Sequence, residues 1–212
     1  MDQYLQDSYF LDYHEPIVSS FVKEHIDRTM TDVQKAVSLY HAVRDRWKYR
    51  ANVIYFNEVD WKCSVIMQRE EGHCLDKAIL LISCLRSVGI PARIHLAKVK
   101  NHIAAEHLIE KFGTNELTPH GMLDLYLGDK WIKVSPSFNK SLCERLNVAP
   151  LDFNGEHDCV FQQYNSDGDE FMEYIEDYGH FDDLPLDFIY HNFSQHYSGL
   201  KDKIKDTGVL SI

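Results

Sequence analysis

The stretch of sequence that decides the fold is GHCLDKAILLISCLRSVGIPAR, residues 72–93. Its apolar side chains recur at the spacing of one helical face, at Ala78, Leu81, Ile82, Leu85 and Val88. We therefore predict an amphipathic helix that begins at Cys74 and is ended by Gly89, because glycine commonly follows a helix C-terminus. Pro91 favours an extended chain after the helix, and alternation in ARIHLAKV, residues 92–99, predicts a strand.

Two helices are predicted before this stretch. Apolar residues at helical spacing run through residues 31–47, with Thr31 or Asp32 as the N-cap. An earlier helix is expected over residues 14–26, because proline at position 16 is tolerated in a first turn. Residues 48–72 show no sustained period, so we expect irregular structure there.

A β-hairpin is predicted after a polar connection over residues 100–118, which we expect to hold a helical turn near residues 102–109. The hairpin strands cover residues 120–127 and 130–134, and the Gly128-Asp129 pair between them is typical of a two-residue turn.

The pattern weakens beyond Pro136. A short helix is predicted over residues 171–178 and a last helix over residues 186–200. We found no repeat or low-complexity linker, so the 212 residues are expected to form a single domain, 1–212. Its core covers about residues 30–140, helices precede the core, and an acidic extension follows over about residues 150–212.

The charge of the chain limits its partners. The net charge is −11, and residues 151–212 hold 14 acidic side chains against 3 basic ones. This acidic balance argues against nucleic acid or an anionic membrane as the main partner. The N-terminus lacks the pattern of a signal peptide, and no apolar run is long enough to span a membrane. Five cysteines without a CxxC pair suit a reducing compartment, so we expect a cytoplasmic protein.

Cys74 stands out chemically because it lies in the first turn of its predicted helix. The helix dipole and the unpaired N–H groups there are expected to lower a cysteine pKa from about 8.5 to roughly 3.5–7.5 and to bind an oxyanion. Gly72 leaves room for a substrate carbonyl. A thiol nucleophile needs a base, and His120, at the start of the hairpin, can reach the sulfur if its strand packs beside the helix.

Three blocks of sequence resemble the transglutaminase-like superfamily. They are YHAVRDRWKYR at residues 40–50, the Gly72–Arg93 run, and PHGMLDLYLGDKWIKVSP at residues 119–136. The C-terminal part resembles that of a bacterial subgroup of cysteine peptidases and transglutaminases. The resemblance implies an α+β, papain-like fold in which a helix with the nucleophile packs on an antiparallel sheet. It also implies that Cys74 is the nucleophile and His120 the general base.

The third catalytic position departs from the family pattern. The family commonly has aspartate where this chain has Ser135, so Ser135 and the later Asn139 are both candidates to orient the imidazole. For the oxyanion site, Gln68 has the spacing of the papain-type glutamine, and Trp61 is the candidate by analogy with transglutaminases.

The predicted function is hydrolysis of a peptide or protein amide through a thioester. The alternatives are acyl transfer from protein glutamine, as in transglutaminases, and a catalytically silent binding domain that keeps the fold. No metal or cofactor is predicted: residues 102–107 only superficially resemble a zinc motif, and phosphate-binding loops are absent.

Overall fold

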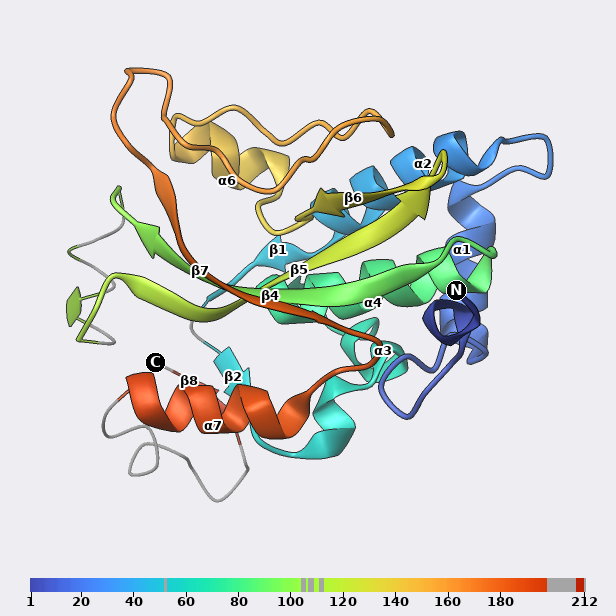
Figure 1. Cartoon of the computed structure of the whole chain (residues 1–212), viewed down its shortest axis with the longest axis horizontal. Coiled ribbons are helices and arrows are strands. Elements are labelled where there is room, and N and C mark those ends of the chain that lie inside the picture. Colours follow the sequence, from blue (N-terminus) through green and yellow to red (C-terminus); the bar gives the residue numbers. More distant parts are fainter. Residues whose placement is uncertain (52, 104–105, 107–108, 111–112, 198–208, 212) are drawn as a thin grey trace.

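The computed structural model describes residues 1–51, 53–103, 106, 109–110, 113–197 and 209–211. Its centre is an antiparallel sheet of four strands in the order β6-β5-β4-β7 (Figure 1). The strands are β4 (Ala92–Asn101), β5 (Glu116–Leu127), β6 (Lys130–Val134) and β7 (Met172–Phe181). Together with the helices described next, this sheet confirms the predicted α+β, papain-like class.

The hairpin between β5 and β6 is the one predicted from Gly128-Asp129. Both residues have positive φ, 55° and 63°, as the favoured two-residue hairpin turn requires. Register pairs Leu123 with Val134 and Leu127 with Lys130. The pairing therefore stops at Leu123, and the earlier part of β5 has no β6 partner on that side.

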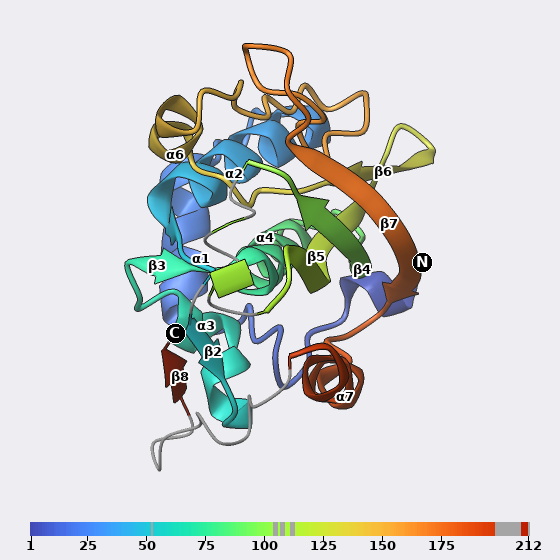
Figure 2. The same cartoon turned by 90° about the vertical axis from the view of Figure 1, so that its left-hand side faces the viewer.

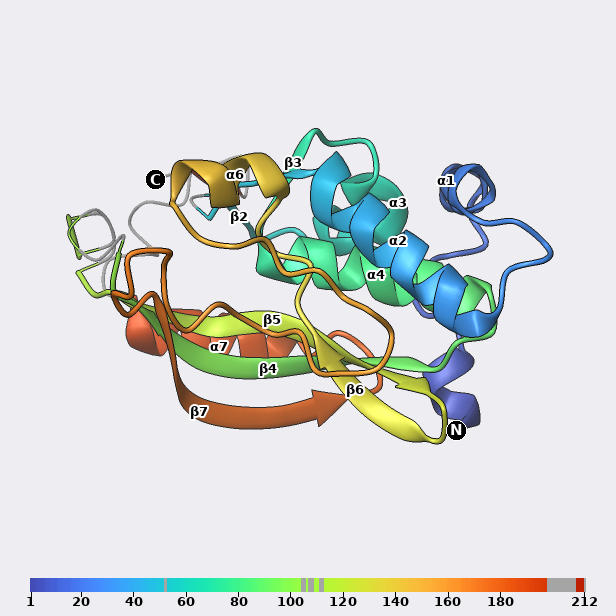
Figure 3. The same cartoon turned by 90° about the horizontal axis from the view of Figure 1, so that it is seen from above.

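Three helices cover one face of the sheet (Figure 3): α1 (Pro16–His25), α2 (Asp32–Arg46) and α4 (Cys74–Ser87). All three lie where the sequence predicts them, with a capping box at Thr31 and Gly89 in the left-handed conformation after α4. The α4 stripe packs on sheet residues such as Ile94 and Leu123 in the main core. This packing places the first turn of α4 against β5.

The opposite face of the sheet carries a smaller core. Ala97, Val99 and Met122 point into it from the sheet, and chain segments after β6 cover them. These segments include α6 (Lys140–Arg145), while α7 (Leu186–His196) packs with the main core. The predicted extension of the last helix to residue 200 lies outside the described residues, as does part of the predicted helical turn over 102–109.

Short elements complete the fold. Two single-turn 3₁₀ helices are η1 (Asp2–Leu5) and η2 (Glu58–Trp61), and α3 is a short helix (Cys63–Ile66). Two small ladders pair β1 (Lys48–Tyr49) with β3 (Glu71–Gly72), and β2 (Val53–Tyr55) with β8 (Val209–Ser211). Among the described residues, no helix has the combination of length and apolar character that crossing a membrane requires.

The helix predicted over residues 171–178 is wrong, because this segment forms strand β7. β7 pairs along β4, from Ile94 opposite Phe181 to Asn101 opposite Met172. The sequence alternates Met172 and Tyr174 with more exposed neighbours, which suits a strand at a sheet edge. The backbone hydrogen bonds that β4 offers at this edge outweigh the local helical preference of the acidic residues.

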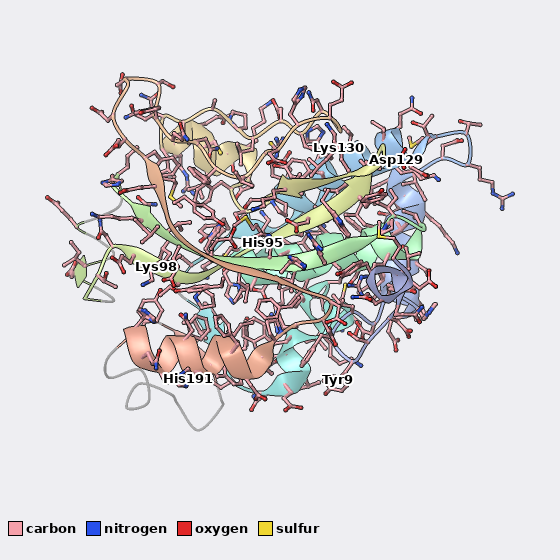
Figure 4. The ribbon with its side chains drawn as sticks, in the orientation of Figure 1. Tyr9, His95, Lys98, Asp129, Lys130 and His191 are labelled. Carbon is pink, nitrogen blue, oxygen red and sulfur yellow. The ribbon has the colours of Figure 1, made fainter. Side chains whose placement is uncertain are left out.

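A buried histidine ties β7 to the sheet. His95 on β4 bonds Asp124 through Nδ1 at 2.9 Å and Asp177 through Nε2 at 2.7 Å, and Figure 4 shows it in the middle of the sheet. Burial opposes protonation of this ring, but the hydrogen bonds to the two carboxylates and the charge of Asp124 outweigh it and raise the pKa of His95.

Lys77 is fully buried in the interior between the helices. Its Nζ donates to the carbonyl oxygens of Arg44, Trp47 and Ser137 at 2.7, 2.9 and 2.7 Å. One ammonium group thus joins the end of α2, helix α4 and the chain after β6. Burial lowers the pKa of Lys77 to about 7.

Candidate active site

Cys74 is the first residue of α4, and a buried cap holds this helix end. The Nδ1 atom of His73 accepts from Asp76 N–H at 3.2 Å, and Asp76 Oδ2 accepts from His73 N–H at 3.0 Å. His73 is therefore a buried capping residue. Because Nδ1 accepts the Asp76 N–H, the ring proton of neutral His73 lies on Nε2.

Gly121 lets β5 approach the first turn of α4, which Figure 2 views end-on. A Cβ atom at Gly121 would lie 2.9 Å from Leu75 Cα and 3.0 Å from Leu75 N. These separations leave space for a hydrogen atom only. Since β6 pairs with β5 no further than Leu123, the helix end meets an open strand edge here. The Cys74 sulfur consequently lies beside the backbone that follows His120.

The Cys74 thiol is buried, with 9 % of the residue exposed. Burial raises its pKa to about 11, although nearby N–H groups of Gly121, Leu75 and Cys74 itself favour the thiolate. The expectation of a lowered pKa is therefore wrong. The reason is that the free-energy cost of desolvating the thiolate exceeds the stabilisation that the N–H groups of the first helical turn give it.

His120 is also buried, and burial lowers its pKa to about 4. Its ring is on the face of β5 that carries Met122, away from the body of α4. Within the described residues no hydrogen bond joins the ring to Cys74, and its Nδ1 has no partner. The thiol and the imidazole are thus both neutral between pH values of about 4 and 11.

The two candidates for the third position lie differently with respect to His120. Ser135 lines one small cavity with His120, and its hydroxyl bonds the Ser137 hydroxyl at 2.8 Å. Asn139 does not line this cavity, because its amide is used elsewhere: Oδ1 accepts from Tyr49 N–H at 2.9 Å and Nδ2 donates to Ser141 at 2.8 Å. The structure brings Ser135 near His120 and keeps Asn139 apart.

Neither candidate for the oxyanion site lines the cavity beside Cys74. The Gln68 side chain is exposed and donates to the Ser64 carbonyl oxygen at 3.1 Å. Trp61 is fully buried, and its indole N–H is shared between Tyr190 Oη at 3.0 Å and the Tyr55 carbonyl oxygen at 3.2 Å. The donors nearest to the Cys74 sulfur are instead the backbone N–H groups of Gly121 and of the first turn of α4.

A mostly apolar cavity of about 450 Å³, including space open to solvent, lies beside Cys74. The start of β5 and the end of α7 form two of its walls, with Thr118, Pro119, Phe193 and Tyr197. Tyr197 holds the walls together, because its hydroxyl accepts from Thr118 N–H at 2.8 Å. The cavity can receive an apolar group attached to a carbonyl that faces the thiol.

The site has one neighbour that the sequence did not reveal. Gln162 follows β6 by nearly thirty residues, yet it lines the same small cavity as His120 and Ser135. It is 8 % exposed, and its Oε1 has no partner among the described residues. No periodic pattern surrounds it, so the sequence carried no signal for its position.

Metal ligands do not gather near this site. No group of three His, Cys, Asp or Glu side chains in the described part of the chain is arranged to hold a metal ion. Of the run over residues 102–107, His107 lies outside the described residues.

Comparison with known proteins places the chain in a family. No curated protein matches it. A solved structure of a proposed cysteine protease from Cytophaga hutchinsonii is 19 % identical, with a TM-score of 0.47, over 63 % of this chain and 40 % of that one. This chain thus spans less than half of that protein's length. The model of the transglutaminase-like superfamily matches residues 19–136, more than half of the sequence, and the chain belongs to this superfamily.

Proposed function

We propose that the protein is a cysteine-dependent hydrolase of peptide or protein amides, with Cys74 as nucleophile and His120 as general base. Membership of the transglutaminase-like superfamily supports a cysteine-dependent hydrolase or acyltransferase. The observation that carries the proposal is the contact of Gly121 with the first turn of α4. This contact sets the Cys74 thiol beside the strand residue that follows His120, next to a cavity for an acyl group.

In the proposed reaction the thiol and the imidazole start neutral. As Sγ of Cys74 forms a bond to the substrate carbonyl carbon, His120 takes the thiol proton, and first-turn N–H groups stabilise the oxyanion. Collapse of this intermediate breaks the C–N bond, and the His120 proton goes to the leaving amine. Water then attacks the thioester with His120 again as base, which releases a carboxylic acid and restores the thiol.

Hydrolysis is preferred to acyl transfer because transfer requires a second site that binds an amine. The cavity beside Cys74 is mostly apolar, and the residues that line it include no carboxylate to attract an amine. Its lining suits an uncharged, apolar acyl side chain.

The proposal is tested with p-nitrophenyl acetate, an ester that transfers its acetyl group to a thiol as its C–O bond breaks and p-nitrophenolate is released. We expect one equivalent of acetyl thioester on Cys74, found by mass spectrometry of peptides, and loss of the p-nitrophenolate burst in Cys74→Ala. Cys159→Ala is the control, because Cys159 is the least buried of the five cysteines and lies outside the cavity. Acetyl groups spread over several cysteines, or absent from Cys74, would favour the catalytically silent domain.

A further inference from the structure

We propose that Gln162 positions His120 for catalysis by accepting the Nδ1 proton of its ring, either directly or through one water molecule. This inference rests on the proposed function, because it assigns the third member of the catalytic group. Gln162 would act through His120 and is a positioning residue.

The need for an acceptor comes from His120. The residue is 4 % exposed, and its Nδ1 is buried without a partner among the described residues. A buried polar atom left unpaired costs about 1–3 kcal/mol, so a nearby acceptor is strongly favoured. The acceptor must lie in the cavity that His120 lines.

Gln162 offers the complementary group. Its Nε2 donates to the Ala149 carbonyl oxygen at 2.6 Å and approaches the Cys143 sulfur at 3.7 Å. These contacts fix the orientation of the amide, since an oxygen in that place would face another acceptor. The remaining atom, Oε1, is a buried acceptor without a partner in the described part of the structure. His120 Nδ1, which donates when it carries the ring proton, and the acceptor Gln162 Oε1 are therefore both unsatisfied beside one cavity.

The small cavity is suited to a water molecule that bridges His120 and Gln162. Ser135 and Ser137 line it together with the two unsatisfied side chains, and the other lining residues are apolar. It has room for about one water molecule, and a buried water typically makes about three hydrogen bonds. His120, Gln162 and the serine pair supply that number of partners.

The other amide and carboxylate oxygens near His120 are already hydrogen-bonded. Asn139 bonds Tyr49 and Ser141, and Asp124 on the same strand bonds His95 at 2.9 Å and Arg93 at 2.8 Å. The Ser135 and Ser137 hydroxyls bond each other at 2.8 Å, and their remaining lone pairs face the same small cavity as further partners for a water. Gln162 is left as the side chain with a free, oriented carbonyl oxygen on the cavity.

The assignment has a chemical consequence. An acceptor at Nδ1 keeps the proton there and leaves the lone pair of Nε2 to take the thiol proton. An amide does this without adding the charge that an aspartate would bring, in keeping with a His120 that stays neutral at ordinary pH. Gln162 lies beyond residues 19–136, so this part of the site comes from outside the segment that matches the family.

The direct test is the tautomer of His120, read from long-range ¹H–¹⁵N correlation spectra of the full-length protein at pH 7. The His120 signals are identified by their loss in His120→Gln. We expect a single tautomer protonated at Nδ1 in the wild type and a loss of this preference in Gln162→Met. The neighbouring Gln163→Met is the matched control, because Gln163 is exposed and should leave the spectrum unchanged. A wild-type ring protonated at Nε2, or an unchanged tautomer in Gln162→Met, would overturn the proposal.

Two rate measurements test whether the tautomer of His120 affects the reaction of Cys74. Acylation of Cys74 by p-nitrophenyl acetate should slow roughly tenfold in Gln162→Met, as part of the 10²–10⁴ that a positioned base contributes. Alkylation of Cys74 by iodoacetamide at pH 10, which needs only the thiolate, should stay within about twofold. Equal slowing of both reactions would point to a structural defect and overturn the positioning role. If the wild type fails to acylate Cys74, the proposed function fails, and the tautomer spectra still decide whether Gln162 holds His120.

Discussion

Replacing Gly121 with alanine would separate the two halves of the candidate site. The added Cβ would lie 2.7 Å from Leu75 Cδ2 and 2.9 Å from Leu75 Cα. The side-chain atom can rotate away, but the Cα belongs to the backbone of the first turn of α4. Ordinary van der Waals contact begins at 3.4 Å, so this turn must retreat from β5 by at least about 0.5 Å.

Gly121→Ala is expected to lower both the stability of the protein and the rate of Cys74 acylation. Overpacking of a tight contact destabilises a protein by about 1–3 kcal/mol, and urea denaturation of Gly121→Ala should show a loss in this range. The same movement displaces the Cys74 sulfur from the N–H of Gly121 and from the strand that carries His120. Because a misplacement of 1 Å can cost about 10²-fold in rate, we expect acylation by p-nitrophenyl acetate to fall between roughly 10- and 100-fold.

Gly89→Ala separates the loss of stability from the loss of rate. Gly89 has a φ of 82° at the far end of α4, and nothing lies within 4 Å of the position of an added Cβ. Alanine there strains the backbone by about 1–2 kcal/mol but leaves the first turn in place. We expect similar destabilisation and a wild-type acylation rate. If Gly121→Ala is folded and acylates as fast as Gly89→Ala, the close approach of β5 to α4 is not what assembles the site.

Three further predictions concern the buried charges and the third catalytic position. Lys77→Met leaves three buried carbonyl oxygens without their donor, so urea denaturation should show a loss of roughly 3 kcal/mol in the free energy of unfolding. Lys35→Met, which breaks a pair with the largely exposed carboxylate of Asp32, should cost under about 1 kcal/mol. Similar losses in the two variants would contradict the role of Lys77. Because folding raises the pKa of His95, its protonated ring stabilises the fold, and this contribution is fully present below pH 6.5. The free energy of unfolding should decline by up to about 1.4 kcal/mol per pH unit as the pH rises through that pKa. A His95→Gln variant with the same pH dependence would refute this linkage. Ser135→Asp puts a carboxylate in the cavity that His120 lines and should raise the pKa of His120 by about 1–3 units. The acylation rate should then fall at a higher pH on the acid side of its pH profile. An unchanged profile would show that the carboxylate does not reach the ring.

The sequence predicts the part of the fold that depends on local patterns. Helix α4 follows from its apolar stripe and Gly89, and the hairpin follows from Gly128-Asp129, since both signals act over a few residues. β7 could not be predicted in this way, because its strand conformation depends on an open edge of β4 far along the chain. The predicted acidic extension therefore supplies the fourth strand of the sheet.

The candidate site was predictable to a similar degree. Cys74 and His120 could be named because they sit in blocks of sequence with family character. The burial of both groups, which makes the thiol and the imidazole neutral, depends on packing by several elements and leaves no trace in the motif. Gln162 was missed because the cavity that it shares with His120 forms only when distant segments come together.

The central claim is that a neutral Cys74 thiol reacts because His120 removes its proton. The most direct test is the rate of Cys74 acylation by p-nitrophenyl acetate between pH 3 and 8, in the wild type and in His120→Gln. Since the pKa values are about 4 for His120 and about 11 for Cys74, the wild-type rate should fall below pH 4 and stay level from about pH 5 to 8. Without the base, the rate should follow the thiolate and rise about tenfold per pH unit. Identical profiles for the two proteins would contradict the account.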